Sequence, residues 1–428
     1  MILVFKNNFH YHISRSCIMS ILKPFALTQL QAHLKTGEIC IILSGEEKTR
    51  NHDVHYPFRA SSHFKYFCTL NETDCALVIE KTHKGLKINL FKKPYDAQSA
   101  LWTSGRMPLN QAKEDPLIED VALFEQFPAF LQSLPTGGNI FSDPHALIEI
   151  KTLPLNQIMG KCRMLKKDAE LSDIQKAINL SAHGHKKLMQ TTLPGMNEAQ
   201  LALTFMHEAA KHGISEQAYP PIIAGGERAC ILHYCENNQP LQPDTLVLID
   251  AGIEVNGYAS DITRTFPVSG KFSPAQKALY EVVLAVQAHA IEHAIIGQTW
   301  SKLNQEAKDL MLDKLLEIGF LSGTKINHQK NNTLSKYFYH GLGHWLGLDV
   351  HDPCPYKNSD AQEVAFEAGM VITIEPGIYV RPSPDIDEKW HNIGIRIEDD
   401  ILITETGAKV LSAHIPKTID EIEALCQK

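Results

Sequence analysis

The sequence has no excess of basic residues. Its 41 lysines and arginines stand against 49 aspartates and glutamates, which leaves a net charge of -8. Proteins that bind nucleic acids or membrane surfaces carry basic stripes or patches, so this balance predicts neither partner. The chain also lacks any apolar run near the roughly 18 to 20 residues that span a bilayer, which excludes a transmembrane segment. A small molecule or a peptide is the favoured partner.

Cysteine is infrequent, and its spacing excludes the common disulfide and zinc frameworks. The nine cysteines are an odd number and form no CxxC pair, so we interpret them as reduced thiols. The first 18 residues include Lys6 and Arg15, but His10 and His12 interrupt any apolar region of a signal peptide. We therefore expect a cytoplasmic protein, in which Met19 could be the true start and residues 1–18 an N-terminal extension.

The length and the periodicity of apolar residues predict two main domains. The chain has 428 residues, of which 44% are hydrophobic and 21% charged, as is typical of globular proteins with a sizeable core. The pattern breaks around Pro154, so we expect one domain over 19–157 and a second over 158–428. The periodicity predicts strands at 38–43, 74–80 and 86–91 and helices at 28–35, 168–189, 198–211, 274–296 and 301–318.

The densest group of candidate site residues lies in residues 340–352, which read His-Gly-Leu-Gly-His-Trp-Leu-Gly-Leu-Asp-Val-His-Asp. Three histidines, His340, His344 and His351, fall within twelve positions and have three glycines between them. Glycine allows backbone and ligand to approach closely, and histidine is a common metal ligand. A glycine-rich turn whose histidines only satisfy their own hydrogen bonds would have the same composition. The rest of the chain favours a functional site.

A β-hairpin brings two aspartates together. Two β-rich runs flank Asn256-Gly257, which is the strongest short hairpin signal. A two-residue turn there places Asp250 opposite Thr263 and makes Asp261 a diagonal neighbour of Asp250 on the same face. The two carboxylates would repel each other at neutral pH, so a bound cation is the natural explanation.

The chain contains an internal repeat. Residues 241–252 align without gaps on residues 366–377, 125 residues later, and Asp250 falls on Glu375. Each half has a second acid on a following strand. A duplicated α/β unit with a pseudo-two-fold axis would gather these acids at one centre between the halves. The residues gathered there would be Asp250, Asp261, Glu375 and Glu398, together with His344.

The second half is expected to contain two long strands, at 369–377 and 394–403. Alternate residues of a strand lie on the same face, so Arg396 would share a face with Glu398. Its guanidinium could there orient the carboxylate or a bound anion.

Four carboxylates and one imidazole form a hard, oxygen-rich ligand set. Such a set suits manganese, cobalt, iron or a labile zinc, unlike the sulfur-rich sets of structural zinc sites. The four negative charges balance two divalent cations. Two such metals about 3.5 to 4 Å apart can activate a bridging water and polarise a substrate carbonyl. The sequence therefore predicts a dinuclear metal centre for amide hydrolysis.

These motifs resemble those of the bacterial aminopeptidase P (Xaa-Pro aminopeptidase) family of pita-bread metallopeptidases, over nearly the whole chain. The matching stretches are Ile231-Leu-His233-Tyr234, Leu-Ile-Asp250-Ala-Gly, Asp261-Ile-Thr-Arg-Thr-Phe, residues 340–352, Ile-Glu375-Pro-Gly and Gly-Ile-Arg396-Ile-Glu398-Asp. The resemblance implies an α/β (α+β) fold, in which a creatinase-like α/β N-terminal domain precedes a duplicated pita-bread catalytic domain. It also implies removal of the N-terminal residue from peptides with proline in the second position.

The resemblance further implies a role for each site residue. The expected ligands of two metal ions, with manganese the expected metal, are Asp250, Asp261, His344, Glu375 and Glu398. His233, His340 and His351 would position the substrate and stabilise the tetrahedral intermediate, and Glu375 would also handle the proton of the attacking water. Arg396 and Trp102 are the expected substrate-binding residues. Trp102 falls where family members present a tryptophan to a neighbouring active site, so a homo-oligomer, a dimer or a tetramer, is expected.

Other activities of related proteins remain alternatives. Prolidase shares the fold, the metals and the His-Gly-Leu-Gly-His motif, but cleaves Xaa-Pro dipeptides. A metal-free pita-bread binding module would lack the ligands, and a methionine aminopeptidase would lack the N-terminal domain. The stretch Phe67-Cys-Thr-Leu-Asn71 lacks a glycine usual in the family, and the loop 353–360 lacks an arginine that some relatives have. Preference for short or long peptides is therefore open.

Overall fold

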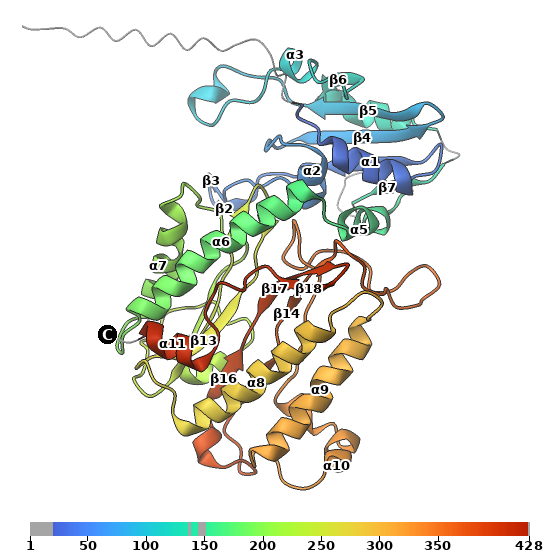
Figure 1. The fold of residues 1–428 in the computed structure, drawn as a ribbon. Helices are drawn as coiled ribbons and strands as arrows, with labels where there is room; N and C mark the ends of the chain where they lie inside the picture. Colours follow the sequence, from blue (N-terminus) through green and yellow to red (C-terminus); the bar gives the residue numbers. More distant parts are fainter. Residues whose placement is uncertain (1–19, 136–137, 144–150, 427–428) are drawn as a thin grey trace, which may run out of the picture. The chain divides into compact units, whose positions relative to one another are not determined.

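The computed structural model describes residues 20–135, 138–143 and 151–426 (Figure 1). It divides into two compact units, unit 1 over Met1–Leu155 and unit 2 over Asn156–Lys428. The division lies next to the expected domain boundary near residue 157. The expected extension, residues 1–18, lies outside the described residues. No helix in the described part of the chain is both long and apolar enough to cross a membrane.

Unit 1 is built on a mixed six-stranded sheet with the strand order β6-β5-β4-β1-β7-β8. These strands are β1 (Ile39–Leu43), β4 (Cys75–Thr82), β5 (Gly85–Lys92), β6 (Asp120–Leu123), β7 (Ile140–Ser142) and β8 (Leu153–Pro154). A separate short hairpin pairs β2 (Thr49–Asn51) with β3 (Val54–His55). The three strands expected from the sequence are those at the centre of the sheet. β1 and β4 are rich in β-branched residues, which pack well on a pleated, buried surface.

The helices of unit 1 are short. They are α1 (Pro24–His33), α2 (Ser62–Phe67), α3 (Leu109–Ala112), α4 (Phe127–Gln132) and the 3-10 turns η1 (Ser99–Leu101) and η2 (Phe124–Gln126). The helix expected at 28–35 begins earlier, because Pro24 occupies its first turn, where the missing N–H costs nothing. Helix α4 packs its apolar side chains on one face of the sheet, against Ile41, Val78 and Phe91.

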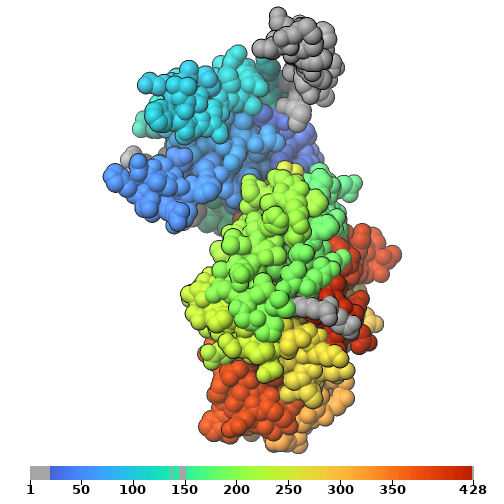
Figure 2. Space-filling view, turned by 90° about the vertical axis from the view of Figure 1, so that its left-hand side faces the viewer, coloured from blue at the N-terminus to red at the C-terminus, as the bar shows by residue number. Residues whose placement is uncertain are grey.

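Unit 2 contains the long helices. They are α5 (Asn156–Met164), α6 (Asp168–Thr191), α7 (Glu198–Ala210), α8 (Pro274–His293), α9 (Trp300–Glu317), α10 (Lys325–Lys330) and α11 (Ile419–Cys426), with 3-10 turns η3 (Gly226–Cys230), η4 (Thr333–Lys336) and η5 (Glu388–Trp390). Side-chain caps fix two of the starts: Asn197 accepts from Ala199 N and Ser273 accepts from Gln276 N. Helices α8 and α9 lie side by side (Figure 1). Helices α6 and α7 pack together and cover much of the face of unit 2 that Figure 2 shows.

The strands of unit 2 form several small sheets. They are β9 (Ile222–Gly225), β10 (Leu246–Asp250), β11 (Glu254–Val255), β12 (Tyr258–Ala259), β13 (Thr263–Pro267), β14 (Val371–Ile374), β15 (Gly377–Val380), β16 (Ile393–Arg396), β17 (Asp399–Thr404) and β18 (Gly407–Val410). The three-stranded sheets have the orders β13-β10-β9 and β14-β17-β18. The expected hairpin register is confirmed, because Asp250 lies opposite Thr263. Asn256 and Gly257 both have positive φ, as this tight turn requires.

The expectation of two long strands in the second half is wrong. Each of them is broken: the run 369–377 into β14 and β15, and the run 394–403 into β16 and β17. β14 pairs with β17, whereas β15 pairs with β16, so the chain changes partner at each break. Pro376 lies at the first break, where it has no N–H to donate to a ladder. The breaks release Glu375 and Glu398 from regular pairing.

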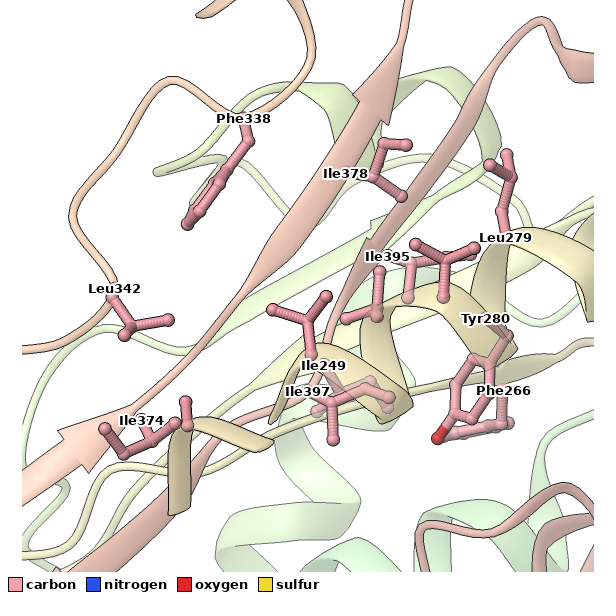
Figure 3. Close-up of a cluster of buried hydrophobic side chains, with 14 of the residues drawn as sticks. Ile249, Phe266, Leu279, Tyr280, Phe338, Leu342, Ile374, Ile378, Ile395 and Ile397 are labelled. Carbon is pink, nitrogen blue, oxygen red and sulfur yellow. The ribbon is translucent and has the colours of Figure 1, made fainter. Parts of the chain in front are cut away.

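The core of unit 2 lies between these sheets and α8. Figure 3 shows part of it, in which Ile249 and Phe266 of the first half lie near Ile395 and Ile397 of the second and near Leu279 of α8. All of these side chains are almost fully buried. Burial of this much apolar surface fixes the two halves against each other and so determines where the acids at their strand ends lie.

Candidate metal centre

One cavity of unit 2, of about 710 Å³, collects the site residues predicted in this part of the chain. The predicted residues that line it are His233, Asp250, Asp261, His340, His344, His351, Glu375, Arg396 and Glu398. Leu232, from the stretch Ile231-Leu-His233-Tyr234, also contributes to the wall, as do Asn156 and Tyr356, to which no motif pointed. Trp102 is not in this cavity: it follows η1 in unit 1, with 86% of its surface exposed.

The repeat places the acids at equivalent points of the two halves. Asp250 is the last residue of β10, and Glu375 directly follows β14. The second acid of each half comes just before the antiparallel partner strand, Asp261 ahead of β13 and Glu398 ahead of β17. Because an antiparallel partner starts where the first strand ends, both acids of each half lie at the same sheet edge.

The histidine segment reaches this edge by running along β14. Thr373 N donates to His344 O at 2.9 Å, and Glu375 N donates to Leu342 O at 2.8 Å. Gly343 permits this approach, since a Cβ there would lie 2.0 Å from Thr373 O. The backbone pairing therefore places His344 beside Glu375.

Three of the candidate ligands already form a compact group. Asp261, His344 and Glu398 each offer a ligand atom, and these atoms lie within 4.8 Å of one another. His344 Nε2 is 3.3 Å from Asp261 Oδ2 and 3.7 Å from Glu375 Oε1. His344 Nδ1 lies 3.1 Å from Trp345 O and donates to it, so Nε2 is the nitrogen that faces the carboxylates. Burial opposes protonation of this ring, but the hydrogen bond to Asp261 outweighs it and raises the pKa of His344 to about 9, so Nε2 carries a proton that a bound metal would displace.

Tyr219 joins the two acids of the first half. Its hydroxyl lies 2.6 Å from Asp250 Oδ1 and 2.6 Å from Asp261 Oδ1. One phenol carries one proton, so the two carboxylates share a single donor. Burial first, and then the two aspartates, raise the pKa of Tyr219 well above its usual value, which keeps this proton in place. No motif signalled Tyr219, because it lies on a loop ahead of β9.

Arg396 donates no hydrogen bond directly to Glu398, contrary to the expectation from strand alternation, and reaches it only through the hydroxyl of Thr263. Its Nη2 donates to Asp250 Oδ2 at 2.6 Å, its Nη1 to Tyr379 OH at 3.0 Å and its Nε to Thr263 Oγ1 at 3.1 Å. The alternation fails because the strand ends at Arg396. Arg396, which belongs to the second half, therefore compensates the charge of Asp250, which belongs to the first half.

The acids at this centre crowd negative charge in a buried space. Burial raises the pKa of Glu375 to about 7, although His344 and Arg396 oppose the shift. Burial and the neighbouring Asp261 raise the pKa of Glu398 well above its usual value. Burial also opposes ionisation of Asp261, but the hydrogen bond from His344 outweighs it and lowers the pKa of Asp261. Buried carboxylates that destabilise one another form a site suited to a cation, so the donor set fits divalent metal ions.

The other three histidines surround the acids. Tyr379 OH donates to His340 Nε2 at 2.7 Å, and His340 Nδ1 donates to Gly341 O at 2.7 Å. Burial, and then the nearby Arg396, lower the pKa of His340 to about 3, so this imidazole is neutral. The ring of His351 stands edge-on to that of His344, with centroids 4.1 Å apart. His233 is exposed on the loop after η3.

Two family models match the chain. Residues 172–405 match metallopeptidase family M24, and residues 27–141 match the aminopeptidase P N-terminal domain. The Xaa-Pro aminopeptidase of Haemophilus influenzae is 38% identical over 411 residues, which cover 93% of this chain and 95% of the relative. The Xaa-Pro aminopeptidase of Escherichia coli K12 is 35% identical over 423 residues, which cover 92% and 95%.

Solved structures agree with these matches. Proline aminopeptidase P II from Yersinia pestis superposes with a TM-score of 0.88 at 33% identity, over 94% of this chain and 98% of that one. Aminopeptidase P from E. coli with the inhibitor Pro-Leu has a TM-score of 0.87 at 32% identity, over 94% and 97%. The chain, with its acid and histidine cavity in a pita-bread unit, therefore belongs to metallopeptidase family M24 and, within it, to the aminopeptidase P proteins.

Proposed function

We propose that this chain is a metal-dependent Xaa-Pro aminopeptidase, which removes the N-terminal residue from peptides with proline in the second position. The observation that carries the proposal is that all five candidate metal ligands and three further histidines line one cavity. The relatives that cover nearly the whole chain are themselves named Xaa-Pro aminopeptidases.

The proposed ligands of two divalent ions are Asp250, Asp261, His344, Glu375 and Glu398. Their oxygen-rich character favours manganese, and the four carboxylates balance the charge of two such ions. When bound, the ions lower the pKa of water and polarise a substrate carbonyl. One solved relative is described as zinc-substituted E. coli aminopeptidase P, so zinc is the comparison metal for this chain.

The protein groups around the ions handle protons and substrate. Glu375 accepts the proton of the attacking water and returns it to the departing proline nitrogen. Its carboxylate lines the cavity, where a water and the substrate can reach it. His340, neutral and fixed by Tyr379, orients the peptide beside Glu375, from which its Nδ1 is 3.7 Å away. His233 and His351, on two different loops that line the cavity, donate to the carbonyl oxygen as it gains charge. Arg396 lines the cavity and holds Asp250 in place by a hydrogen bond.

Trp102 and assembly form a second part of the proposal. Leu101 and Trp102 are 81% and 86% exposed, which is costly for large apolar side chains unless another surface covers them. In a homo-oligomer, a dimer or a tetramer, Trp102 would cover the cavity of a neighbouring subunit and exclude water from it. Trp102→Ala should then lower kcat/KM by roughly tenfold to a hundredfold with both metals retained. A fully active monomer would contradict this.

The remaining parts of the proposal concern organisation. Residues 19–157 form a creatinase-like N-terminal domain and residues 158–428 the catalytic domain, and the protein acts in the cytoplasm. Fractionation of the source cells with a cytoplasmic marker tests the location.

Hydrolysis of a Xaa-Pro-Yaa tripeptide tests the activity. Purified protein is treated with chelator, and manganese or zinc is then restored. We expect release of the free N-terminal amino acid only when metal is present, and no release from a matched Xaa-Ala-Yaa tripeptide. Cleavage of a Xaa-Pro dipeptide but not of the tripeptide would instead assign the chain as a prolidase. Inactivity on both with metal restored would overturn the proposal.

A further inference from the structure

A buried group of charges lies beneath the loop that carries His351. It consists of Arg163 at the end of α5, Lys166 just after it, and Asp352. Their exposed fractions are 2%, 5% and 5%. The two cations come from residues 156–167, which neither family match covers. The two family models thus leave this segment out, although Asn156 at its start lines the cavity of the candidate metal centre.

The two cations form ion pairs with loop residues on both sides of His351. Arg163 Nη2 is paired with Asp352 Oδ1 and lies 2.7 Å from Asp349 Oδ2. Lys166 Nζ lies 3.1 Å from the other oxygen of Asp352. Asp349 N also donates to Asp352 Oδ1 at 3.3 Å, so the carboxylate of Asp352 closes the short loop on itself. His351 lies between these two anchored residues in the sequence.

The backbone that carries the two cations is itself paired with the residues just ahead of β14, the strand that Glu375 directly follows. Lys166 N donates to Gly369 O at 2.8 Å, and Leu165 forms a β-bridge with Met370, immediately ahead of β14. At the other end of the loop, Asp352 N donates to Trp345 O at 2.9 Å. The path from the α5 end to Asp352 is therefore short, lies in the interior of unit 2 and is connected at both ends to segments that carry candidate ligands.

Helix α5 also touches the loop directly. A Cβ added at Gly160 would lie 2.5 Å from Pro353 O, so the helix backbone packs against the residues that follow Asp352. Only a glycine allows this approach without displacement of the loop.

We propose that Arg163 and Lys166 are positioning residues for His351, and that the segment ahead of the M24 match is part of the catalytic machinery. They act through Asp352 to hold the imidazole at the site where the carbonyl oxygen gains charge. Displacement of a catalytic group by about 1 Å can cost a hundredfold in rate, so loss of the ion pairs with Asp352 should lower kcat. The inference rests on the proposed function for its kinetic readout.

A double-mutant cycle tests the proposal. Arg163→Met and Lys166→Met are made in the parent and in a His351→Ala background, and kcat and KM are measured on a Xaa-Pro-Yaa tripeptide. We expect each change to lower kcat of the parent by roughly tenfold to a hundredfold with metal content retained. In the His351→Ala background the same changes should have almost no further effect, because residues that act through His351 have nothing left to position.

A matched control and a milder variant complete the cycle. Lys314→Met breaks an exposed ion pair with Glu317 and should leave kcat unchanged in both backgrounds. Arg163→Lys keeps the positive charge but loses the planar guanidinium that binds two carboxylates at once, so its loss of kcat should be smaller than that of Arg163→Met. It replaces Arg163→Met if that variant fails to fold. Equal losses of kcat in the parent and in the His351→Ala background would show a merely structural role and overturn the proposal.

Hydrogen exchange distinguishes failure of this inference from failure of the proposed function. If the parent does not cleave the tripeptide at all, the proposed function fails, but exchange still reports on the loop. We expect Lys166→Met to speed amide exchange in residues 349–354 and to leave β10 and β13 as in the parent. Unchanged exchange in residues 349–354 would overturn the inference whatever the activity.

Discussion

Thr263 and Glu398 join the two repeated halves through a pair of hydrogen bonds. The hydroxyl of Thr263 donates to Glu398 Oε2 at 2.7 Å, and Glu398 N donates to Thr263 O at 3.1 Å. The same hydroxyl accepts from Arg396 Nε at 3.1 Å. A buried threonine of the first half therefore fixes both the backbone and the carboxylate of an acid from the second half. Groups that orient a metal ligand by hydrogen bonds affect the metal affinity of the site.

Thr263→Val should weaken metal binding while the fold is retained. The valine keeps the shape of the side chain but removes the donor to Glu398. We expect divalent metal affinity to fall by roughly tenfold to a hundredfold in calorimetric titration of metal-depleted protein. Thr265→Val is the matched control, since Thr265 lies two residues along β13 and its hydroxyl contacts the backbone of Arg396. Equal loss of affinity in both variants would contradict the assignment of Glu398 as a ligand.

Removal of a ligand charge should remove metal and activity together. Asp261→Asn and Glu398→Gln each leave a neutral amide where a carboxylate is needed. We expect the parent to bind two divalent ions per chain by elemental analysis, and each variant to have lost activity but not its circular dichroism spectrum. An active preparation with no metal above background would show that the centre has been misassigned. Glu317→Gln, on the exposed end of α9, is the control.

The three histidines outside the ligand set should affect turnover without affecting metal content. His233→Ala, His340→Ala and His351→Ala each remove a group that we propose contacts the substrate or its developing charge. A loss of kcat of roughly a hundredfold or more is expected, the size typical of a lost proton-transfer or oxyanion group. Metal content is measured on the same samples. If metal disappears along with activity, the variant residue is a ligand and the roles must be exchanged.

His185 makes the stability of unit 2 sensitive to pH. Its ring is fully buried in α6, Nε2 donates to Ala251 O at 3.0 Å, and burial lowers the pKa of His185 to about 3. In the unfolded chain the pKa of this histidine is near 6.5, so between about pH 6.5 and pH 3 the unfolded chain binds a proton at His185 and the folded chain does not. The free energy of unfolding therefore falls as pH drops from about 6.5 towards 3, by up to about 1.4 kcal/mol per pH unit from this residue.

Urea unfolding at pH 7.5, 6.0 and 5.0 measures this contribution. His185→Gln should show a shallower loss of stability than the parent as pH falls, and exposed His207→Gln should match the parent. A Trp102→Phe background restricts tryptophan fluorescence to unit 2, because the other tryptophans, Trp300, Trp345 and Trp390, lie there. Identical slopes for His185→Gln and the parent would show that the histidine is protonated in the fold.

Gly184→Ala should destabilise unit 2 although alanine favours helices. A Cβ at Gly184 in α6 would lie 2.3 Å from the ring of Phe205 in α7. The overpacked methyl is expected to cost about 1 to 3 kcal/mol, more than the roughly 0.5 to 1 kcal/mol that alanine gains over glycine in a helix. Adding Phe205→Leu removes the conflicting ring atoms, so the double variant should lose less than the sum of the two single changes. Thermal unfolding compares them; simple additivity would contradict the contact.

Local chemistry explains why several elements could be predicted. The Asn256-Gly257 turn fixes a register by its own backbone preference, and the structure has Asp250 opposite Thr263 as expected. The helices that begin at Asp168 and Glu198 have their start signals within a few residues of sequence. The periodicity of the sequence did not predict the strand breaks. The change of partner between β14 and β15 depends on β17 and β16, which local residue patterns do not reveal.

The sequence by itself determined which groups are available: the acids at repeated strand ends, the histidines of residues 340–352 and the family to which they point. Motif and spacing carry that information because they depend on residue type alone. Only the tertiary structure decided which groups touch. Arg396 binds Asp250 rather than Glu398, Tyr219 joins two aspartates, and Arg163 reaches Asp352 from 189 residues away in the chain. These contacts follow from the burial of a shared core, which no local pattern encodes.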